Sequence, residues 1–202
     1  FGIETDVHRT SDGRFIIVHD NDTARVAGNA QVYEVERTDY ATLRSLPLLD
    51  RNGKAGRVDL RLPSLDEYIE CCQKYEKTCV LELKNRMEKA DVKEIAERFR
   101  AAGYLDRVIF ISFCFENLAD LREICPDQPL QYLTRELRED LFEAARACRM
   151  DLDTDWRSVT KEWVDRLHAA GMKLNTYTVN DPKVAERFAD WGLDYITTNI
   201  LE

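Results

Sequence analysis

Apolar and polar residues alternate at the start of the chain, in the stretch FGIETDVH. A period of two residues is typical of a strand, in which successive side chains point to opposite faces. In such a strand Glu4, Asp6 and His8 share one face. Neighbouring carboxylates repel each other there, and two interpretations remain open: solvated charges on an edge strand, or ligands of a bound cation.

Short apolar runs rich in β-branched and aromatic residues recur along the rest of the chain and predict further strands. They cover residues 15–18, 79–83, 108–112, 130–133, 150–152, 174–179 and 195–198. Helical patterns, with apolar residues three and four positions apart, lie between most of them. One helix is predicted to begin at Ser64, where Glu67 completes a capping box, and another to end at Gly103.

From Cys79 onward one helix follows each strand, at intervals of roughly 20 to 30 residues, which is typical of repeated βα units. An open doubly wound sheet and a (β/α)8 TIM barrel both have this order. No strand is followed by the glycine-rich turn of dinucleotide-binding sheets, and this favours the barrel. Seven strands follow the βα order, with residues 15–18 as a hairpin-like addition. A barrel needs eight, so we expect that its first strand and helix are missing from this chain.

Residues 21–62 interrupt the βα order with a long segment that contains three glycines and a helical pattern after Thr38. A segment of this length in a barrel is usually a functional insertion at the active-site end. We therefore predict one α/β barrel domain over residues 1–202, N-terminally incomplete, with an insertion at residues 21–62 after the second strand.

The net charge and the distribution of apolar residues exclude some classes of binding partner. The net charge of -9 argues against a nucleic-acid surface and against adhesion to anionic lipid. No apolar run is long enough to cross a bilayer, so we expect no stable membrane insertion. The six cysteines lack the C-x-x-C spacing of zinc sites. Reduced thiols in a cytoplasmic protein are the expected state.

Candidate chemistry lies at the carboxyl ends of the predicted strands, where barrel enzymes carry their active sites. Glu4 and Asp6 belong to the first strand, and Glu82 and Lys84 to the strand at 79–83. Three carboxylates that converge at one rim repel one another unless a divalent cation lies among them. Oxygen ligands favour Mg²⁺ or Ca²⁺.

The stretch IETDVHRTSDGRFIIVHD resembles the core motif of the glycerophosphodiester phosphodiesterases, the TIM-barrel phosphodiesterases similar to phosphatidylinositol phospholipase C. LPSLDEYI, LELK, VIFISF, NTYTVNDP and GLDYITTN are similar to further family motifs and follow in the same order. The resemblance implies a (β/α)8 barrel with an insertion after the second strand. It also implies a phosphoric diester hydrolase that uses one divalent cation and acid–base catalysis to release an alcohol and sn-glycerol 3-phosphate from a small glycerophosphodiester.

The resemblance also assigns roles to single residues. It implies metal ligands at Glu4, Asp6 and Glu82, an acid–base residue at His19, and substrate contacts at Lys84 and Tyr177. The imidazole of His8 is interpreted as structural or peripheral.

Two departures from the family pattern affect the expected activity. The family's His-Arg-Gly and Pro-Glu-Asn-Thr motifs are absent, and Tyr177 replaces the usual Trp. We therefore expect residues 1–202 alone to lack turnover. The alternatives are a lysophospholipase D or sphingomyelinase D-like phosphodiesterase and a non-catalytic barrel fragment. The alcohol, the metal and the oligomeric state stay open.

Overall fold

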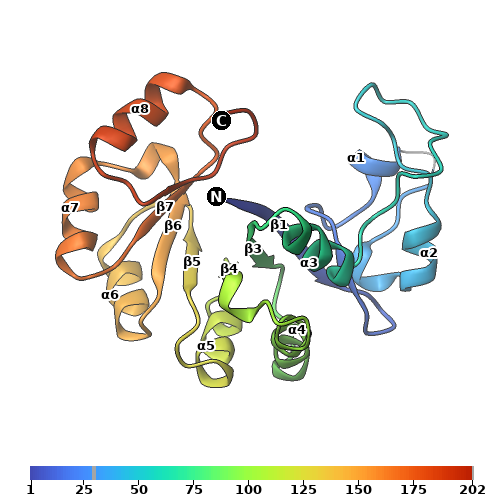
Figure 1. Ribbon diagram of the computed structural model, residues 1–202, viewed down its shortest axis with the longest axis horizontal. Coiled ribbons are helices and arrows are strands. Elements are labelled where there is room, and N and C mark those ends of the chain that lie inside the picture. Colours follow the sequence, from blue (N-terminus) through green and yellow to red (C-terminus); the bar gives the residue numbers. More distant parts are fainter. Residues whose placement is uncertain (29–30, 202) are drawn as a thin grey trace. The chain divides into compact units, whose positions relative to one another are not determined.

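The computed structural model describes residues 1–28 and 31–201 (Figure 1). Residues 29–30, which belong to the predicted insertion, lie outside the described part. The chain divides into two compact units, Phe1–Val108 and Ile109–Glu202, and each is described by itself.

The sheet of the first unit is built around its first strand. Strand β1, Gly2–Arg9, pairs in antiparallel fashion with β2, Phe15–Ile17, and in parallel with β3, Thr78–Leu83. Both the early strand and its hairpin-like partner are therefore confirmed. In the parallel ladder Asp6 lies opposite Glu82, and this register brings acidic positions of β1 and β3 together.

Two long helices complete the first unit, together with the short 3-10 helix η2, Leu105–Arg107. Helix α3, Leu65–Lys74, begins at the predicted capping box, in which Ser64 and Glu67 satisfy each other's backbone N–H groups. Helix α4, Lys89–Ala101, is followed by Gly103 in a left-handed conformation with φ of +65°, which glycine adopts without a steric cost.

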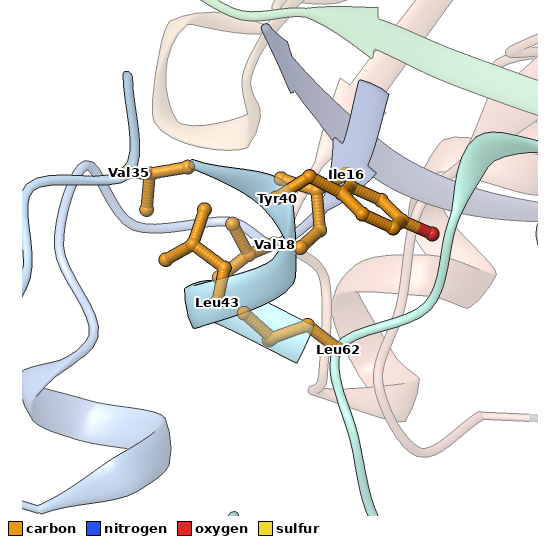
Figure 2. Close-up of a cluster of buried hydrophobic side chains, with 6 residues drawn as sticks. All are labelled: Ile16, Val18, Val35, Tyr40, Leu43 and Leu62. Atoms are coloured by element: carbon orange, nitrogen blue, oxygen red, sulfur yellow. The ribbon is translucent and has the colours of Figure 1, made fainter. Parts of the chain in front are cut away.

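The segment between β2 and α3 contains three short helical pieces rather than a strand: α1, Ala24–Ala27; η1, Val35–Arg37; and α2, Tyr40–Ser45. A hydrophobic cluster fixes this segment to the sheet. Figure 2 shows its six buried side chains, which come from β2 and its end and from the 21–62 segment: Ile16, Val18, Val35, Tyr40, Leu43 and Leu62. Burial of these side chains, with Val35, Leu43 and Ile16 fully inaccessible, gives the segment a defined position although little of it is regular.

The second unit repeats a strand and a helix. Its strands pair in parallel in chain order from β4 to β8. The strands are β4, Val108–Ser112; β5, Leu130–Thr134; β6, Asp151–Asp155; β7, Leu174–Tyr177; and β8, Tyr195–Ile196. The helices are α5, Phe115–Ile124; α6, Glu139–Ala147; α7, Lys161–Ala169; and α8, Pro182–Asp190, with the 3-10 helix η3 at Trp156–Ser158.

Three strands in this unit differ from the sequence prediction by two residues or more at their carboxyl ends. The strand expected at 150–152 spans Asp151–Asp155, and buried hydrogen bonds hold the Asp153 Oδ2 atom and the Thr154 hydroxyl of its polar second half. The strands expected at 174–179 and 195–198 end at Tyr177 and Ile196. Apolar content alone therefore underestimated one strand and overestimated two.

Both units are mixed α/β structures in which parallel strands alternate with helices. The fold class is confirmed to that extent. A closed barrel, a missing first unit, an insertion and a single domain stay predictions. All six cysteines are free thiols. Within residues 1–28 and 31–201, no helix combines the length and apolar character needed to cross a bilayer.

Candidate active site

Three carboxylates of the first unit meet beside one another. Glu4 and Asp6 lie two positions apart on β1, so their side chains share a face, and Glu82 stands opposite Asp6 on β3. One oxygen from each residue lies within 4.8 Å of the other two. Asp6 and Glu82 are buried, at 4% and 7% exposure, whereas Glu4 lies at the solvent-exposed side of the group. The three carboxylates therefore converge as expected, although Glu4 and Asp6 lie within β1 and not at its carboxyl end, because the strand continues to Arg9.

One ammonium group balances part of this charge. Lys84 Nζ lies 3.0 Å from Glu82 Oε1 and 3.3 Å from Asp6 Oδ1. The backbone N–H of Lys84 donates to the carbonyl of Val7 at 3.2 Å, which fixes where the lysine leaves β3. With three carboxylates and one lysine, the cluster retains an excess of negative charge when all groups are ionised.

The crowding of these carboxylates changes the pKa values of Glu4 and Glu82. Loss of hydration, followed by the negative charges of Asp6 and Glu82, raises the pKa of Glu4 to about 8. Burial also raises the pKa of Glu82, against the lowering effect of Lys84. Asp6 Oδ1 is buried and has no hydrogen-bond partner among the described residues, with only the ion pair to Lys84 beside it. This set of crowded oxygen donors fits a hard divalent cation.

His19 lies just beyond the β2 side of the same sheet. The N–H of Val18, its chain neighbour, donates to the carbonyl of Asp6 at 3.1 Å. The imidazole is exposed, at 66%, and its Nδ1 lies 2.8 Å from Asp20 Oδ1. Arg25 Nε donates to the other oxygen of Asp20 at 2.6 Å, and this hydrogen bond, together with that to His19, lowers the pKa of Asp20. His19 is thus oriented by a carboxylate that is itself held in place.

Tyr177 belongs to the second unit and ends β7. Its hydroxyl donates to the carbonyl of Thr134, at the end of β5, at 2.7 Å. The ring contacts Phe113 edge to face, with the centroids 6.1 Å apart. The hydroxyl of Tyr177 is therefore held by the end of β5 and its ring by Phe113.

Sequence reasoning missed a polar group beside the cluster. The carboxylate of Glu36 is hydrogen-bonded to the completely buried imidazole of His8 and to the side-chain amide of Asn85. Asn85 follows Lys84 and has a φ of +52°. An asparagine two residues after the end of β3 was the available signal, since this residue tolerates the left-handed conformation better than most. Glu36 had no signal of its own in the sequence.

The sequence model of the Glycerophosphoryl diester phosphodiesterase family matches residues 2–202. The chain belongs to this family. Its membership confirms the resemblance seen in the sequence motifs, and with it the prediction of a phosphodiesterase enzyme.

Curated relatives and solved structures of the family agree with the assignment. A glycerophosphodiester phosphodiesterase of Bacillus altitudinis is 29% identical over 210 residues, which cover 98% of this chain and 82% of that protein. A crystal structure of such an enzyme from Parabacteroides distasonis is 27% identical, covers 98% of this chain and 79% of its own, and has a TM-score of 0.79. A phosphodiesterase of Oleispira antarctica, solved with the product sn-glycerol-3-phosphate, shares the fold with a TM-score of 0.86 at 23% identity, over 98% of this chain and 80% of that one.

Proposed function

We propose that the protein hydrolyses glycerophosphodiesters to an alcohol and sn-glycerol 3-phosphate, and that it requires one divalent cation. The observation that carries this proposal is the cluster of Glu4, Asp6 and Glu82 with Lys84, in a chain that belongs to this family. The product bound to the Oleispira antarctica relative supports the same substrate class.

Glu4, Asp6 and Glu82 would hold the cation, and Mg²⁺ or Ca²⁺ suits their oxygen atoms. The bound ion supplies positive charge that stabilises the additional negative charge of the phosphoryl group during hydrolysis. Asp6 and Glu82 come from paired positions of β1 and β3, and Glu4 shares a face of β1 with Asp6, so little rearrangement is needed to present the three side chains together.

Lys84 supplies the second positive charge in this proposal. A phosphodiester is an anion, and the ammonium lies where it can contact both the carboxylates and an arriving phosphate oxygen. The buried salt bridges to Asp6 and Glu82 keep the lysine charged and restrict its side chain, because its pKa is raised by these partners despite partial burial.

His19 is proposed as the acid–base residue. Asp20 receives the N–H of Nδ1, which leaves Nε2 to take a proton from an attacking hydroxyl or to give one to the leaving alkoxide. An alkoxide is a poor leaving group, so protonation of its oxygen lowers the barrier. The ring is exposed, and it is therefore accessible to a substrate.

Tyr177 is proposed to pack its ring against the glycerol carbons, in the place where the family usually has Trp. We further propose that the chain forms one (β/α)8 barrel domain of the family, with residues 21–62 as an insertion. The order of the parallel strands and the likeness to family structures over nearly the whole chain support this.

The test is the release of glycerol 3-phosphate from glycerophosphocholine by the full-length protein in the presence of Mg²⁺ or Ca²⁺. We expect turnover that a chelator lowers by at least about 10²-fold and that the added ion restores. Turnover that is unchanged by the chelator would contradict the metal requirement.

Lysophosphatidylcholine serves as the second substrate in the same assay. Faster release of choline from it than of glycerol 3-phosphate from glycerophosphocholine would favour the lysophospholipase D alternative. The absence of turnover on both substrates, with the folded protein and both ions, would favour a non-catalytic protein.

A further inference from the structure

One carboxylate oxygen of the 21–62 segment receives two donors from the ends of the strands that carry the cluster. Glu36 Oε1 lies 3.0 Å from His8 Nδ1 and accepts a hydrogen bond from Asn85 Nδ2 at 2.7 Å. His8 lies near the end of β1, two residues after Asp6, and Asn85 follows Lys84 directly after β3. Glu36 therefore joins the two strands at the point where they leave the candidate active site.

The imidazole of His8 depends on this contact. The residue is completely buried, and Nε2 has no hydrogen-bond partner in the described part of the chain. Because an ionised carboxylate only accepts, the ring donates through Nδ1–H, and Glu36 selects that tautomer. Removal of the acceptor would leave a buried N–H without its partner.

Asn85 links the same oxygen to Lys84. Its backbone is left-handed, and its side chain also donates to Asn21 Oδ1 at 3.3 Å, in the loop that follows His19 and Asp20. The turn after β3 sets the direction of the Lys84 backbone, and so the reach of the ammonium toward Asp6 and Glu82. A shift of this turn would move the lysine.

Glu36 is itself held from the other side. The neighbouring Val35 is completely buried in the cluster of Figure 2, and its N–H donates to the carbonyl of Asn21 at 2.9 Å. The position of the carboxylate is thus set by core packing, whereas the side chain of Glu36 is 40% exposed. A substitution there removes the acceptor without removing a core residue.

We propose that Glu36 is a positioning residue of the active site. Its acceptor oxygen holds the ends of β1 and β3, through His8 and Asn85, in the geometry that places Asp6, Glu82 and Lys84. The assignment rests on the proposed function. In this role the 21–62 segment helps to position the carboxylate cluster, because the place of Glu36 in that segment fixes the ends of β1 and β3.

The test compares Glu36→Ala and Glu36→Gln in the full-length protein, with Glu34→Gln as the matched control. Glu34 lies two positions away and pairs only with the exposed Arg37 through its side chain among the described contacts. We expect Glu36→Ala to lower kcat/KM for glycerophosphocholine about 10-fold, since small displacements of reacting groups have effects of this size or larger. Glu36→Gln keeps an acceptor oxygen for both donors and should stay within about 3-fold of the wild type, as should Glu34→Gln.

A readout that needs no turnover separates failure of this inference from failure of the proposed function. In ¹⁵N spectra of the imidazoles, the wild type and Glu36→Gln should show His8 with Nδ1 protonated and Nε2 unprotonated. Glu36→Ala should move both nitrogens toward the average of free imidazole. Wild-type activity by itself tests the function.

Two results would overturn the positioning role. The first is full activity of Glu36→Ala with an unchanged tautomer of His8. The second is an equal loss of activity in Glu36→Ala and Glu36→Gln, which would mean that the charge of Glu36, not its acceptor oxygen, is required.

Discussion

Buried polar side chains occur on the strands of both units, but they are satisfied in different ways. In the first unit three carboxylates meet, and one ammonium, that of Lys84, pairs with two of them, the buried Asp6 and Glu82. In the second unit the buried carboxylate of Asp153 accepts a hydrogen bond from Asn175 Nδ2 at 3.0 Å. The first arrangement gathers three acidic side chains with one ammonium, whereas the second places a single acidic side chain beside a neutral amide.

The second arrangement is a network of amides and hydroxyls. Asn175 Nδ2 also lies 3.2 Å from Gln131 Oε1, so one amide joins three neighbouring strands. Thr134 and Thr154 are hydrogen-bonded to each other through their hydroxyls at 3.1 Å. These side-chain hydrogen bonds link β5, β6 and β7 and so support the register of the three strands. A group of crowded carboxylates, by contrast, needs a bound proton or a further positive charge to balance it, and this excess of acid distinguishes the cluster of the first unit from the network of the second.

The largest effect is expected at His19, whose chain neighbour Val18 is hydrogen-bonded to the backbone of Asp6. We expect His19→Ala to lower kcat by roughly 10²-fold, because the leaving oxygen then lacks its proton donor. Affinity for the cation should persist, as measured by calorimetry. The matched control is His168→Ala, which removes an imidazole paired with Asp194 in the second unit. Loss of the cation together with His19 would mean that this residue is a ligand.

The second unit is tested by Asn175→Ala, which removes a donor from two buried acceptors. The free energy of unfolding should fall by about 1–3 kcal/mol, the usual effect of unsatisfied buried polar groups. Affinity for the cation should be unchanged. Denaturant unfolding gives the free energy of unfolding, and calorimetry gives the affinity for the cation. The control is Asn52→Ala, on an exposed turn. A weaker cation affinity without a loss of stability would place this network in the site instead.

Much of the fold was predictable because local patterns agree with it. Alternation identified β1, and the Ser64–Glu67 capping box identified the start of α3. The strand of Asp153 was predicted too short because its polar side chains are paired with residues distant in sequence, which no local pattern reveals. For the same reason Glu36 was not predicted: its partners His8 and Asn85 are 28 and 49 positions away.

The site residues likewise fall into those whose arrangement local patterns predict and those whose contacts they do not. Glu4, Asp6 and Glu82 could be placed together from strand periodicity and the parallel order, and the structure brings their oxygens into one group. The pairing of Lys84 with two of them, and of His19 with Asp20, depends on side-chain conformations that the sequence does not specify. Their catalytic and binding roles, like that of Tyr177, stay predictions.

The smallest expected effect concerns Glu67, a carboxylate of the first unit whose charge is compensated. Arg44 donates to both of its oxygens, and this contact lowers the pKa of Glu67 from 4.5 to about 2. An acid with a lowered pKa contributes stability that is complete above the unfolded value and is lost as the pH falls from about 4.5 to 2. In Glu67→Gln the melting temperature should depend less on pH in that window. The side chain is 38% exposed, so solvent screening keeps the effect small. An unchanged slope would show that the ion pair does not persist in solution.

The most direct test of the cation site is a calorimetric titration of the full-length protein with Mg²⁺ and with Ca²⁺. The wild type is compared with the double variant Glu4→Gln, Glu82→Gln, which keeps the side-chain volume of the cluster but removes two of its three negative charges. We expect one bound ion in the wild type and a loss of affinity of at least about 10²-fold in the double variant, since neutral amides are much weaker ligands of hard cations. Equal affinity in both proteins would contradict the assignment of these carboxylates.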